Sequence, residues 1–335
     1  MLKTVETKKT WLLTCLRFVI LSVVFMLFWF VYLSDPGLNT TLGPLDLSCD
    51  RMFEDVIRQA RTEMSRTVTI VESNSGFQPM LDNWLYHVNQ VSPSALRSLV
   101  IVALDKALES NLRGRGFRVY FDDCETDNNT ISSQAEGFRT ASYNKIVFHK
   151  WKISLDGLRT GTNVMLSDAD VVWLRDPLPI ILDSYSGCDF LFTTDDPMSS
   201  QKPSWHNTGF VFFSSTPSTI QVIELFQLWT SEHAEELKGY DDQHAWKEFL
   251  TKSVTSTNMT VSHCEVFVLR IDAEKNLSFS MAILPSSSFM DHKHWVEEST
   301  EFQRSAAITL HYNWLNGFEN KKRAMNKNHH WFLAK

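Results

Sequence analysis

The sequence predicts an α/β domain, built on a sheet of parallel strands between helices, behind a hydrophobic N-terminal segment. Apolar runs of strand length alternate with helical patterns from residue 53 to residue 166. Strands that alternate with helices form parallel sheets whose two faces are both covered. In such sheets ligands bind at the carboxyl ends of the strands, and polar residues follow several of the predicted strands. The 335 residues suffice for one large domain of this kind.

Residues 11–33 have the length and composition of a transmembrane helix. These 23 residues are almost wholly apolar, and a helix of this length reaches about 34 Å, which spans a bilayer. Basic residues precede the segment and aspartates follow it, so the positive-inside rule places the N-terminus in the cytosol. A cleaved signal peptide is the alternative, but the run is long and lacks a small-residue cleavage motif. We expect a cytosolic tail (1–10), a signal anchor (11–33), a stem (34–50) and a lumenal domain (51–335).

Sequons and cysteines agree with a lumenal domain. Four N-x-Ser/Thr sequons predict N-glycosylation at Asn39, Asn128, Asn258 and Asn276. Outside the apolar segment the cysteines are even in number, namely Cys49, Cys124, Cys188 and Cys264. They allow two disulfides, and the sequence does not choose among the connectivities. A zinc site is the alternative, and the lack of a C-x-x-C pair argues against it.

The charge of the chain excludes one class of partner. The formal net charge is −7, and no long run of basic residues occurs. A nucleic-acid backbone is bound through a concentrated positive surface. We therefore expect no nucleic-acid partner.

The first predicted elements are two helices and two strands. Helical patterns cover residues 53–66 and 80–91, and strands cover residues 67–71 and 99–104. The first strand is rich in β-branched residues, and the second is continuously apolar, as buried parallel strands are. Asp105 follows the second strand and is suited to cap the next helix.

The alternation continues with a strand at residues 117–121, a helix at 142–158 and a strand at 163–166. Three polar residues stand just after predicted strands, namely Ser73, Asp105 and Asp168. The carboxyl ends of parallel strands share one edge of a sheet. The clearest acidic motif of the chain, at Asp168, is therefore expected where this fold binds ligands.

Asp168 and Asp170 form this acidic motif. In an extended backbone, two residues apart, their carboxylates project to the same side and repel one another. A divalent cation removes the repulsion, and Mg²⁺ or Mn²⁺ retains positions for phosphate oxygens. A solvated turn is the alternative, but apolar residues flank the motif on both sides, where unpaired carboxylates are costly. We therefore expect a metal site that accepts a diphosphate.

The string VMLSDADVVWLRDP at residues 164–177 resembles the signature of the nucleotide-diphospho-sugar transferase domain of glycosyltransferase family 77. The similarity extends over about residues 67–318, in the order of that family. It includes residues 71–76, 81–85, 99–105, 207–210, 241–243 and 311–314. The resemblance implies the GT-A fold, a Rossmann-like nucleotide-sugar-binding mixed sheet flanked by helices. It also implies retaining transfer from a UDP-sugar, with xylose, galactose and arabinose among the donors.

The resemblance suggests metal ligands position by position. Asp168 and Asp170 match the motif that holds the metal and the nucleotide, with Asp170 as the more direct ligand. His311 follows the apolar residues 306–310 and is the third candidate, because a neutral imidazole suits Mn²⁺. A core histidine bonded to backbone is the alternative for His311. We expect Mn²⁺ (or Mg²⁺) as the cofactor.

Further positions are expected to contact the donor or the reacting atoms. The expected nucleotide-sugar-binding residues are Ser73, Asn74, Asp105, Asp168, Asn207, Thr208, Gly209 and Lys321. Residues 207–209 also fit a turn that enters a strand, and Lys321 with Lys322 also fits a solvated face. The expected catalytic residues are Asp241, Asp242 and Gln243. Acids at a helix start are also ordinary caps, whereas Asp242 is suited to orient an acceptor hydroxyl or to stabilise a cationic transition state.

Other acids and aromatics are expected at the periphery. Two acid pairs, at residues 122–123 and 195–196, are expected in loops, the second at the rim of the site. Trp205, Trp295 and Trp314 are candidates to stack on an acceptor sugar, with burial in the core as the alternative.

The implied function is a metal-dependent retaining glycosyltransferase in the Golgi membrane with its domain in the lumen. It would transfer xylose, galactose or arabinose from a UDP-sugar to a glycan or glycoprotein acceptor. Retention fits a front-face substitution, which needs no carboxylate nucleophile, or a double displacement. A non-catalytic lectin-like or scaffold protein of the same fold, and a UDP-sugar hydrolase, are the alternatives.

Overall fold

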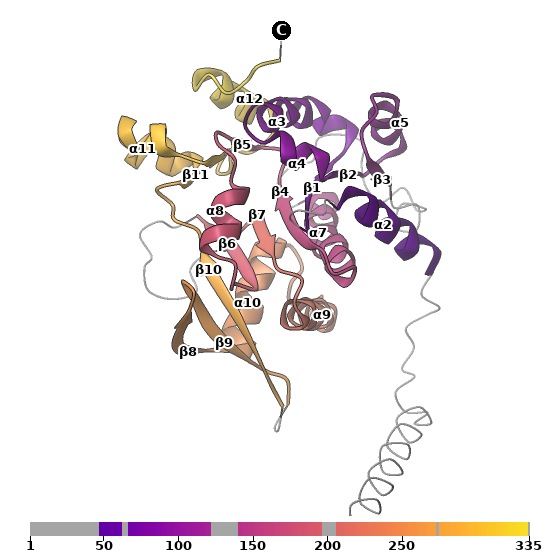
Figure 1. Cartoon of the computed structure of the whole chain (residues 1–335), viewed down its shortest axis with the longest axis vertical. Coiled ribbons are helices and arrows are strands. Elements are labelled where there is room, and N and C mark those ends of the chain that lie inside the picture. Colours follow the sequence, from indigo (N-terminus) through magenta and orange to yellow (C-terminus); the bar gives the residue numbers. More distant parts are fainter. Residues whose placement is uncertain (1–46, 62–65, 122–139, 196–205, 273–274, 334–335) are drawn as a thin grey trace, which may run out of the picture. The chain divides into compact units, whose positions relative to one another are not determined.

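A mixed sheet is the framework of the domain (Figure 1). The computed structural model describes residues 47–61, 66–121, 140–195, 206–272 and 275–333. Within these ranges nine strands form one sheet, in the order β3 (Val119–Phe121), β2 (Leu99–Ala103), β1 (Thr67–Ser73), β4 (Asn163–Ser167), β7 (His206–Phe213), β6 (Phe190–Thr194), β10 (Asn276–Ile283), β9 (Cys264–Arg270) and β8 (Val254–Val261).

The sheet has a parallel half and a largely antiparallel half. β3, β2, β1 and β4 run parallel, as the alternation in the sequence predicts. β7 is antiparallel to both β4 and β6, and β9 is antiparallel to both β10 and β8. β10 is parallel to β6. The periodicity therefore predicts the first half correctly, and the complete sheet is mixed, as the resemblance implies.

Helices cover both faces of the large sheet. They are α2 (Leu47–Ala60), α3 (Gln78–Val91), α4 (Pro93–Arg97), α5 (Lys106–Gly114), α7 (Ala141–Arg159), α8 (Leu178–Ser184), α9 (Pro217–Glu232), α10 (Asp242–Ser253), α11 (Glu301–Ala306) and α12 (Phe318–Lys327), with short turns η2 (Ser75–Phe77) and η3 (His294–Glu298). α2 begins at Leu47, within the segment predicted to be a stem, and ends before the predicted limit of residue 66.

Successive strand residues enter two separate cores. Val71 and Ile101 pack in one buried cluster with residues of α3 and α5. Ile70 and Val100, their neighbours along the chain, pack in the other with residues of α2, α7, α9 and α10. Because side chains alternate between the faces of a strand, a strand covered on both faces must be apolar throughout. The continuous apolar runs of the sequence follow from this arrangement.

A small second sheet lies beside the first and carries the C-terminal part of the site. Its strands, in spatial order, are β11 (Phe289–Asp291), β12 (Thr309–His311) and β5 (Val171–Trp173). Asp291 is in register with His311 on parallel strands, and His311 is in register with Val171 on antiparallel strands. Of the apolar run at residues 306–310 and the histidine that follows it, only Thr309–His311 form a strand, because residue 306 still belongs to α11 and residue 307 caps it. His311 is therefore the last residue of β12.

Some predictions concern residues outside the described ranges. The predicted anchor at residues 11–33, the sequons at Asn39 and Asn128, and Cys124 all lie there. Of the helices in the described ranges, none combines the length and the hydrophobicity that crossing a bilayer requires. Asn258 on β8 and Asn276 on β10 are exposed, so both remain accessible to modification.

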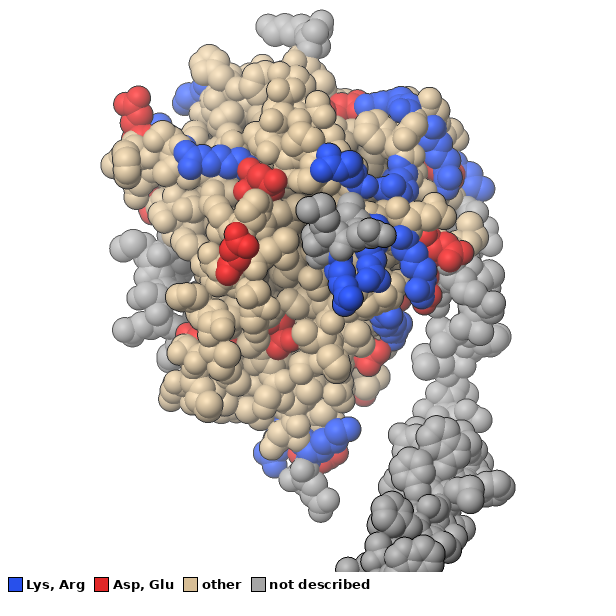
Figure 2. Space-filling model, in the orientation of Figure 1, with Lys and Arg blue, Asp and Glu red and all other residues tan. Residues whose placement is uncertain are grey.

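Figure 2 shows one face of the molecule, on which Lys and Arg side chains gather toward the side of α2 and α5. Several of the arginines on these helices are paired with acids. Arg113 contacts Glu109 at 2.8 Å within α5, and Arg115 contacts Asp82 of α3 at 2.7 Å. Such exposed pairs contribute little to stability, and their acids neutralise part of the positive charge on this side.

A disulfide joins Cys188, just before β6, to Cys264, the first residue of β9, with a Cα–Cα distance of 5.6 Å. The two cysteines are 76 residues apart in the sequence, and both are buried. The bond links the start of β9 to the segment before β6, and β10 lies between these two strands in the sheet. It is one of the pairings that the four cysteines outside the predicted anchor allow.

Replacing Cys188 by Ser is expected to lower the free energy of unfolding by about 2–4 kcal/mol, because the open chain gains conformational entropy when it unfolds. Thermal unfolding of the purified full-length protein, with and without a thiol reductant, measures the effect. The reductant should destabilise the wild type and leave Cys188→Ser unchanged. Equal unfolding temperatures of wild type and variant under oxidising conditions would contradict the prediction.

Candidate active site

A cavity of about 810 Å³ opens at the carboxyl ends of β1 and β4 and is lined by residues of both sheets. Apart from Asp105, every residue predicted to bind metal, to bind the nucleotide sugar or to act in catalysis lines it. The wall also includes residues of α7, α10 and α12. The fold therefore brings positions from residue 72 to residue 321 to one place.

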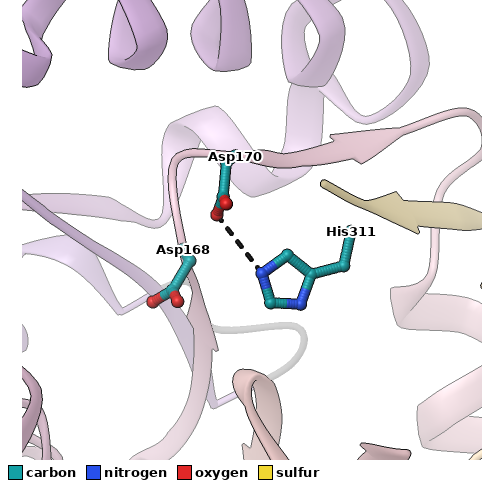
Figure 3. A group of neighbouring side chains, drawn as sticks. All are labelled: Asp168, Asp170 and His311. Carbon is teal, nitrogen blue, oxygen red and sulfur yellow. Dashed lines mark ion pairs between the residues drawn. The ribbon is translucent and has the colours of Figure 1, made fainter. Parts of the chain in front are cut away.

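Asp168, Asp170 and His311 form a constellation that suits a metal ion (Figure 3). One oxygen or nitrogen atom of each lies within 4.8 Å of those of the other two. Asp168 follows β4, Asp170 precedes β5, and His311 ends β12. The Asp170 carboxylate and the His311 ring point toward one another in Figure 3, with 3.3 Å between Oδ1 and Nε2. Two carboxylates and an imidazole are ligands that divalent cations such as Mn²⁺ accept.

Backbone hydrogen bonds hold both aspartates in position. The Asp168 N–H donates to the Gly209 carbonyl at 2.7 Å, which ties the motif to β7. The Tyr312 N–H donates to the Asp170 carbonyl at 3.0 Å, which ties the motif to the residue after His311. The positions of the three candidate ligands therefore depend on the pairing of strands rather than on flexible side chains.

Gly209 makes room for two of these ligands. A Cβ atom at this position would lie 2.4 Å from Cε1 of His311 and 2.9 Å from Oδ2 of Asp168. The His311 ring is buried and is held between Asp170 and Asn207, so moving it aside would break these contacts. Gly209 was expected to bind the nucleotide sugar, and the structure shows that it also leaves room for two of the candidate metal ligands.

Asn207 determines which nitrogen of His311 faces Asp170. Its Oδ1 accepts from the Gly209 N–H at 2.9 Å and lies 3.0 Å from His311 Nδ1. An amide oxygen only accepts, so Nδ1 must carry the proton in the neutral ring and Nε2 keeps its lone pair. Burial lowers the pKa of His311, but the Asp170 carboxylate outweighs burial and raises it above its ordinary value. Nε2 is therefore the nitrogen that can bind either a proton or a metal.

Two lysines balance the charge of the aspartates. Lys150 of α7 is buried, and its Nζ lies 3.0 Å from Asp168 Oδ1. Lys321 of α12 forms an ion pair with Oδ2 of Asp170. Burial alone would raise the pKa of Asp170, but Lys321 and His311 hold it well below its usual range. Asp170 is therefore ionised and able to bind a cation.

Lys321 and Lys322 have different surroundings, although the sequence treats them alike. Lys321 lines the cavity. The ammonium group of Lys322 lies 5.7 Å and 5.4 Å from the ring centroids of Phe318 and Trp331. Cation–π contacts of this kind occupy Lys322 away from the aspartates. Of the two lysines, Lys321 is thus the one that lies at the cavity.

Asp242, one of the predicted catalytic residues, is buried and lies beside Lys150. Its Oδ2 accepts from the Trp151 indole N–H at 3.0 Å. Burial raises the pKa of Asp242 to about 6, and Lys150 opposes part of this shift. The carboxyl group therefore titrates close to neutral pH, which is typical of groups at functional sites.

Asp241 and Gln243 support the site from the start of α10. Asp241 caps the helix, since its Oδ1 accepts from the His244 N–H at 2.9 Å. Gln243 donates to Asp195 Oδ2 at 2.8 Å, and Asn207 donates to Asp195 Oδ1 at 2.8 Å. Asp195, expected at the rim, is thus the half-buried acceptor that joins β7 to α10.

The residues that follow β1 and β2 have separate roles. Asn74 caps η2 through a bond to the Phe77 N–H at 3.0 Å, and it lines the cavity together with Ser73. Asp105 accepts from the Ser75 N–H at 2.6 Å and from the Leu108 N–H at 2.9 Å. Both carboxylate oxygens of Asp105 are therefore used within the protein, and the side chain lies outside the cavity lining.

A comparison of the sequence with protein-family models identifies the family of the domain that carries this cavity. A family model described as nucleotide-diphospho-sugar transferase matches residues 94–325. The chain belongs to this family. The match confirms the resemblance and places a glycosyltransferase domain over β2, β3, β4, the small sheet and most of α12.

Relatives of the transferase domain include named plant enzymes. A beta-arabinofuranosyltransferase, RAY1, of Arabidopsis thaliana is 24% identical over 263 residues, which are 76% of this chain and 45% of that protein. A UDP-D-xylose:L-fucose alpha-1,3-D-xylosyltransferase of Arabidopsis thaliana is 22% identical over 306 residues, 87% of this chain and 76% of that protein. A crystal structure of an active-site mutant of LgtC has a TM-score of 0.48 at 10% identity, covering 80% of this chain and 97% of that chain. This chain therefore spans less than half the length of the first relative.

Lys150 is a cavity residue that the sequence did not indicate. It lies within the predicted helix of residues 142–158, where a single lysine attracts no notice. A signal was present, because Lys150 stands three residues after Val147 and four before Ser154, and both of these are buried. Those spacings place it on the inward face of the helix. A buried lysine needs an acidic partner, and the sequence does not identify Asp168 as that partner.

Replacing Gly209 by Ala is expected to weaken Mn²⁺ binding at least about tenfold, because the new methyl group displaces His311 and Asp168. Calorimetric titration of Mn²⁺ into the purified full-length protein measures the change. Gly114→Ala, in α5 with no atom within 4 Å of the new methyl group, is the matched control and should bind as the wild type does. Wild-type affinity in Gly209→Ala would refute the crowding argument.

Replacing Asp242 by Asn is expected to raise the free energy of unfolding of the transferase domain by up to about 3 kcal/mol at pH 7.5. Near pH 4 the substitution should give no such gain. The folded-state pKa of about 6 exceeds the ordinary value of 3.8, so ionisation of Asp242 opposes folding. The wild type bears no such cost below pH 3.8 and bears it fully above pH 6. Urea unfolding from pH 4 to pH 8 tests this, with the exposed Asp183→Asn as control. A gain that is constant with pH would contradict the burial of an ionisable Asp242.

Proposed function

We propose that this domain catalyses metal-dependent transfer of one sugar from a UDP-sugar to a glycan or glycoprotein, with retention of the anomeric configuration. The observation that carries the proposal is the constellation of Asp168, Asp170 and His311 at the cavity, in a chain of the nucleotide-diphospho-sugar transferase family. Xylose, galactose and arabinose are the proposed donors. The activities for which the two plant relatives are named support arabinose and xylose among them.

The donor set supports Mn²⁺ or Mg²⁺ as the cofactor. Asp168, Asp170 and His311 present oxygen and nitrogen atoms within 4.8 Å of one another, and Gly209 leaves the space that these side chains occupy. Three protein ligands leave coordination positions for phosphate oxygens. When bound, the metal neutralises the charge that develops on the departing UDP.

The two lysines complement this chemistry from opposite sides of the motif. Lys321 contacts Asp170 and is partly exposed in the cavity, so it binds a diphosphate oxygen beside that carboxylate. Lys150 is buried between Asp168 and Asp242, and both carboxylates raise the pKa of its ammonium group despite burial. It therefore remains charged and holds Asp168 in place for the metal.

Asp242 supplies a fixed negative charge to the reacting sugar. It lines the cavity, and its bond to the Trp151 indole prevents rotation of the carboxylate. A carboxylate stabilises the positive charge that develops on a sugar ring as its leaving group departs. Retention follows from a front-face substitution, in which the acceptor oxygen bonds to the anomeric carbon on the side from which UDP leaves. The acceptor proton passes to the leaving phosphate oxygen.

The proposed location is the Golgi membrane, with a type II anchor at residues 11–33 and the transferase domain in the lumen. The Cys188–Cys264 disulfide supports an oxidising compartment. The exposed sequons at Asn258 and Asn276 are consistent with passage through the secretory pathway.

The full-length protein, purified in detergent, is expected to release UDP from at least one of UDP-xylose, UDP-galactose, UDP-arabinose and UDP-glucose when Mn²⁺ is present. Release should fall about 100-fold or more with a chelator or in Asp170→Asn, because charge stabilisation in the transition state is lost. Asp183→Asn, an exposed aspartate on α8, is the matched control and should retain full release.

The other outcomes distinguish the alternatives. If no donor releases UDP and UDP does not bind in the presence of Mn²⁺, the result would favour the lectin-like or scaffold protein. Release that is never accompanied by a glycosylated product, with a panel of glycans as acceptors, would indicate a UDP-sugar hydrolase. Release that resists the chelator would contradict the metal site.

A further inference from the structure

One part of the cavity is lined by residues that the proposed donor site does not use. It lies at the end of β11, in η3 and in the segment after β12, and we call it the acceptor wing. It consists of Asp291, Lys293, His294, Glu298 and Trp314.

The acceptor wing adjoins the metal ligands on the side away from β1. Asp291 is in register with His311 on the parallel strands β11 and β12, so the two residues are neighbours across the small sheet. The residues proposed for the nucleotide, Ser73 and Asn74, stand at the end of β1 in the other sheet. A donor held by the metal between these regions leaves the acceptor wing for the second substrate.

Trp314 is the most conspicuous side chain of the acceptor wing. It is 61% exposed, whereas Trp295 is 9% exposed and belongs to the core. Its φ of +59° is a left-handed conformation that bulky residues rarely adopt. The preceding residue anchors this turn, because the Asn313 side chain accepts from the His292 N–H at 3.3 Å and donates to Asp195. The fold thus holds a large indole at the cavity in a backbone conformation that packing of the indole does not explain.

The acidic groups of the acceptor wing are hydrogen-bond acceptors, and neighbouring groups hold them in place. Asp291 is buried, and its Oδ1 accepts from the His294 N–H at 2.9 Å. His294 Nδ1 lies 3.2 Å from Glu298 Oε2, and its Nε2 has no hydrogen-bond partner among the described residues. Lys293 lies over the Trp314 ring, 6.0 Å from its centroid. Two carboxylates against one lysine give this part of the cavity a negative balance.

We propose that the acceptor wing binds the terminal, uncharged sugar of the acceptor, stacked on Trp314 with its hydroxyls donating to Asp291 and Glu298. This inference rests on the proposed transferase function. An aromatic face matches the apolar C–H face of a sugar ring, and carboxylates accept from its hydroxyls. A sugar that bears a carboxylate would meet Asp291 and Glu298 as like charges, so uronic acids are excluded.

Saturation-transfer NMR on the full-length protein, with Mg²⁺ and UDP present, tests the proposal. The probes are methyl glycosides of fucose, galactose, xylose, arabinose and glucuronic acid. At least one neutral glycoside should bind, and methyl glucuronide should not. Trp314→Ala should raise the dissociation constant of the bound glycoside about tenfold, and Trp314→Phe should restore most of the affinity. Phe302→Ala removes an aromatic that is 81% exposed on α11, outside the cavity lining, and should change nothing.

The outcomes separate this inference from the proposed function. If Mg²⁺-dependent UDP binding is intact and no neutral glycoside binds, or Trp314→Ala binds as the wild type does, the acceptor wing is refuted and the donor site stands. Binding of methyl glucuronide as strong as that of the neutral glycosides would also refute it. If UDP itself does not bind, the proposed function fails first. Because Trp314 is exposed, its truncation leaves no cavity in the core, and UDP affinity reports on the fold of each variant.

Discussion

A carboxylate that is removed from water requires a positive partner, and this constraint organises the whole cavity. Asp168 is paired with Lys150, and Asp170 lies between Lys321 and His311. In a medium of low dielectric, loss of one partner leaves an uncompensated charge that destabilises the folded state. Lys321 and His311 therefore favour the ionised form of Asp170, and Lys150 forms an ion pair with Asp168, at the place where a divalent cation would bind. The same positive charges attract the diphosphate of a nucleotide sugar.

The topology of the two sheets delivers these charges to one place. In the parallel half of the large sheet, β1 and β4 end at the same edge, and His311 of the small sheet lies beside that edge. Gly209 on β7 then permits His311 and Asp168 to approach closely. The glycine, the register of β12 and the turn after β4 thus depend on one another. A change in any of them alters the geometry of the metal ligands before it alters the core.

The sequence predicted those elements whose burial requires a recognisable pattern of apolar residues along the chain. β2 and β4 were found because strands covered on both faces are continuously apolar. β5 and β12 have three residues each, which is too short for a periodic pattern, so the small sheet was not expected. His311 was found as a residue beside an apolar run, whereas Lys150 was hidden inside a helix. Asn207 was expected to contact the donor sugar, and the structure shows that it orients His311.

The sequence by itself determined the alternation of strands and helices, the family, and the acidic motif at Asp168 and Asp170. These features are recorded in residues that are close together in the chain, where periodicity and spacing carry the information. Only the tertiary structure decided which basic side chain pairs with which carboxylate and which tryptophan is exposed at the cavity. Lys321 and Asp170 are 151 residues apart, and nothing local to either residue specifies the other. Their pairing results from strand order and helix packing, because these place the two charges where water no longer screens them.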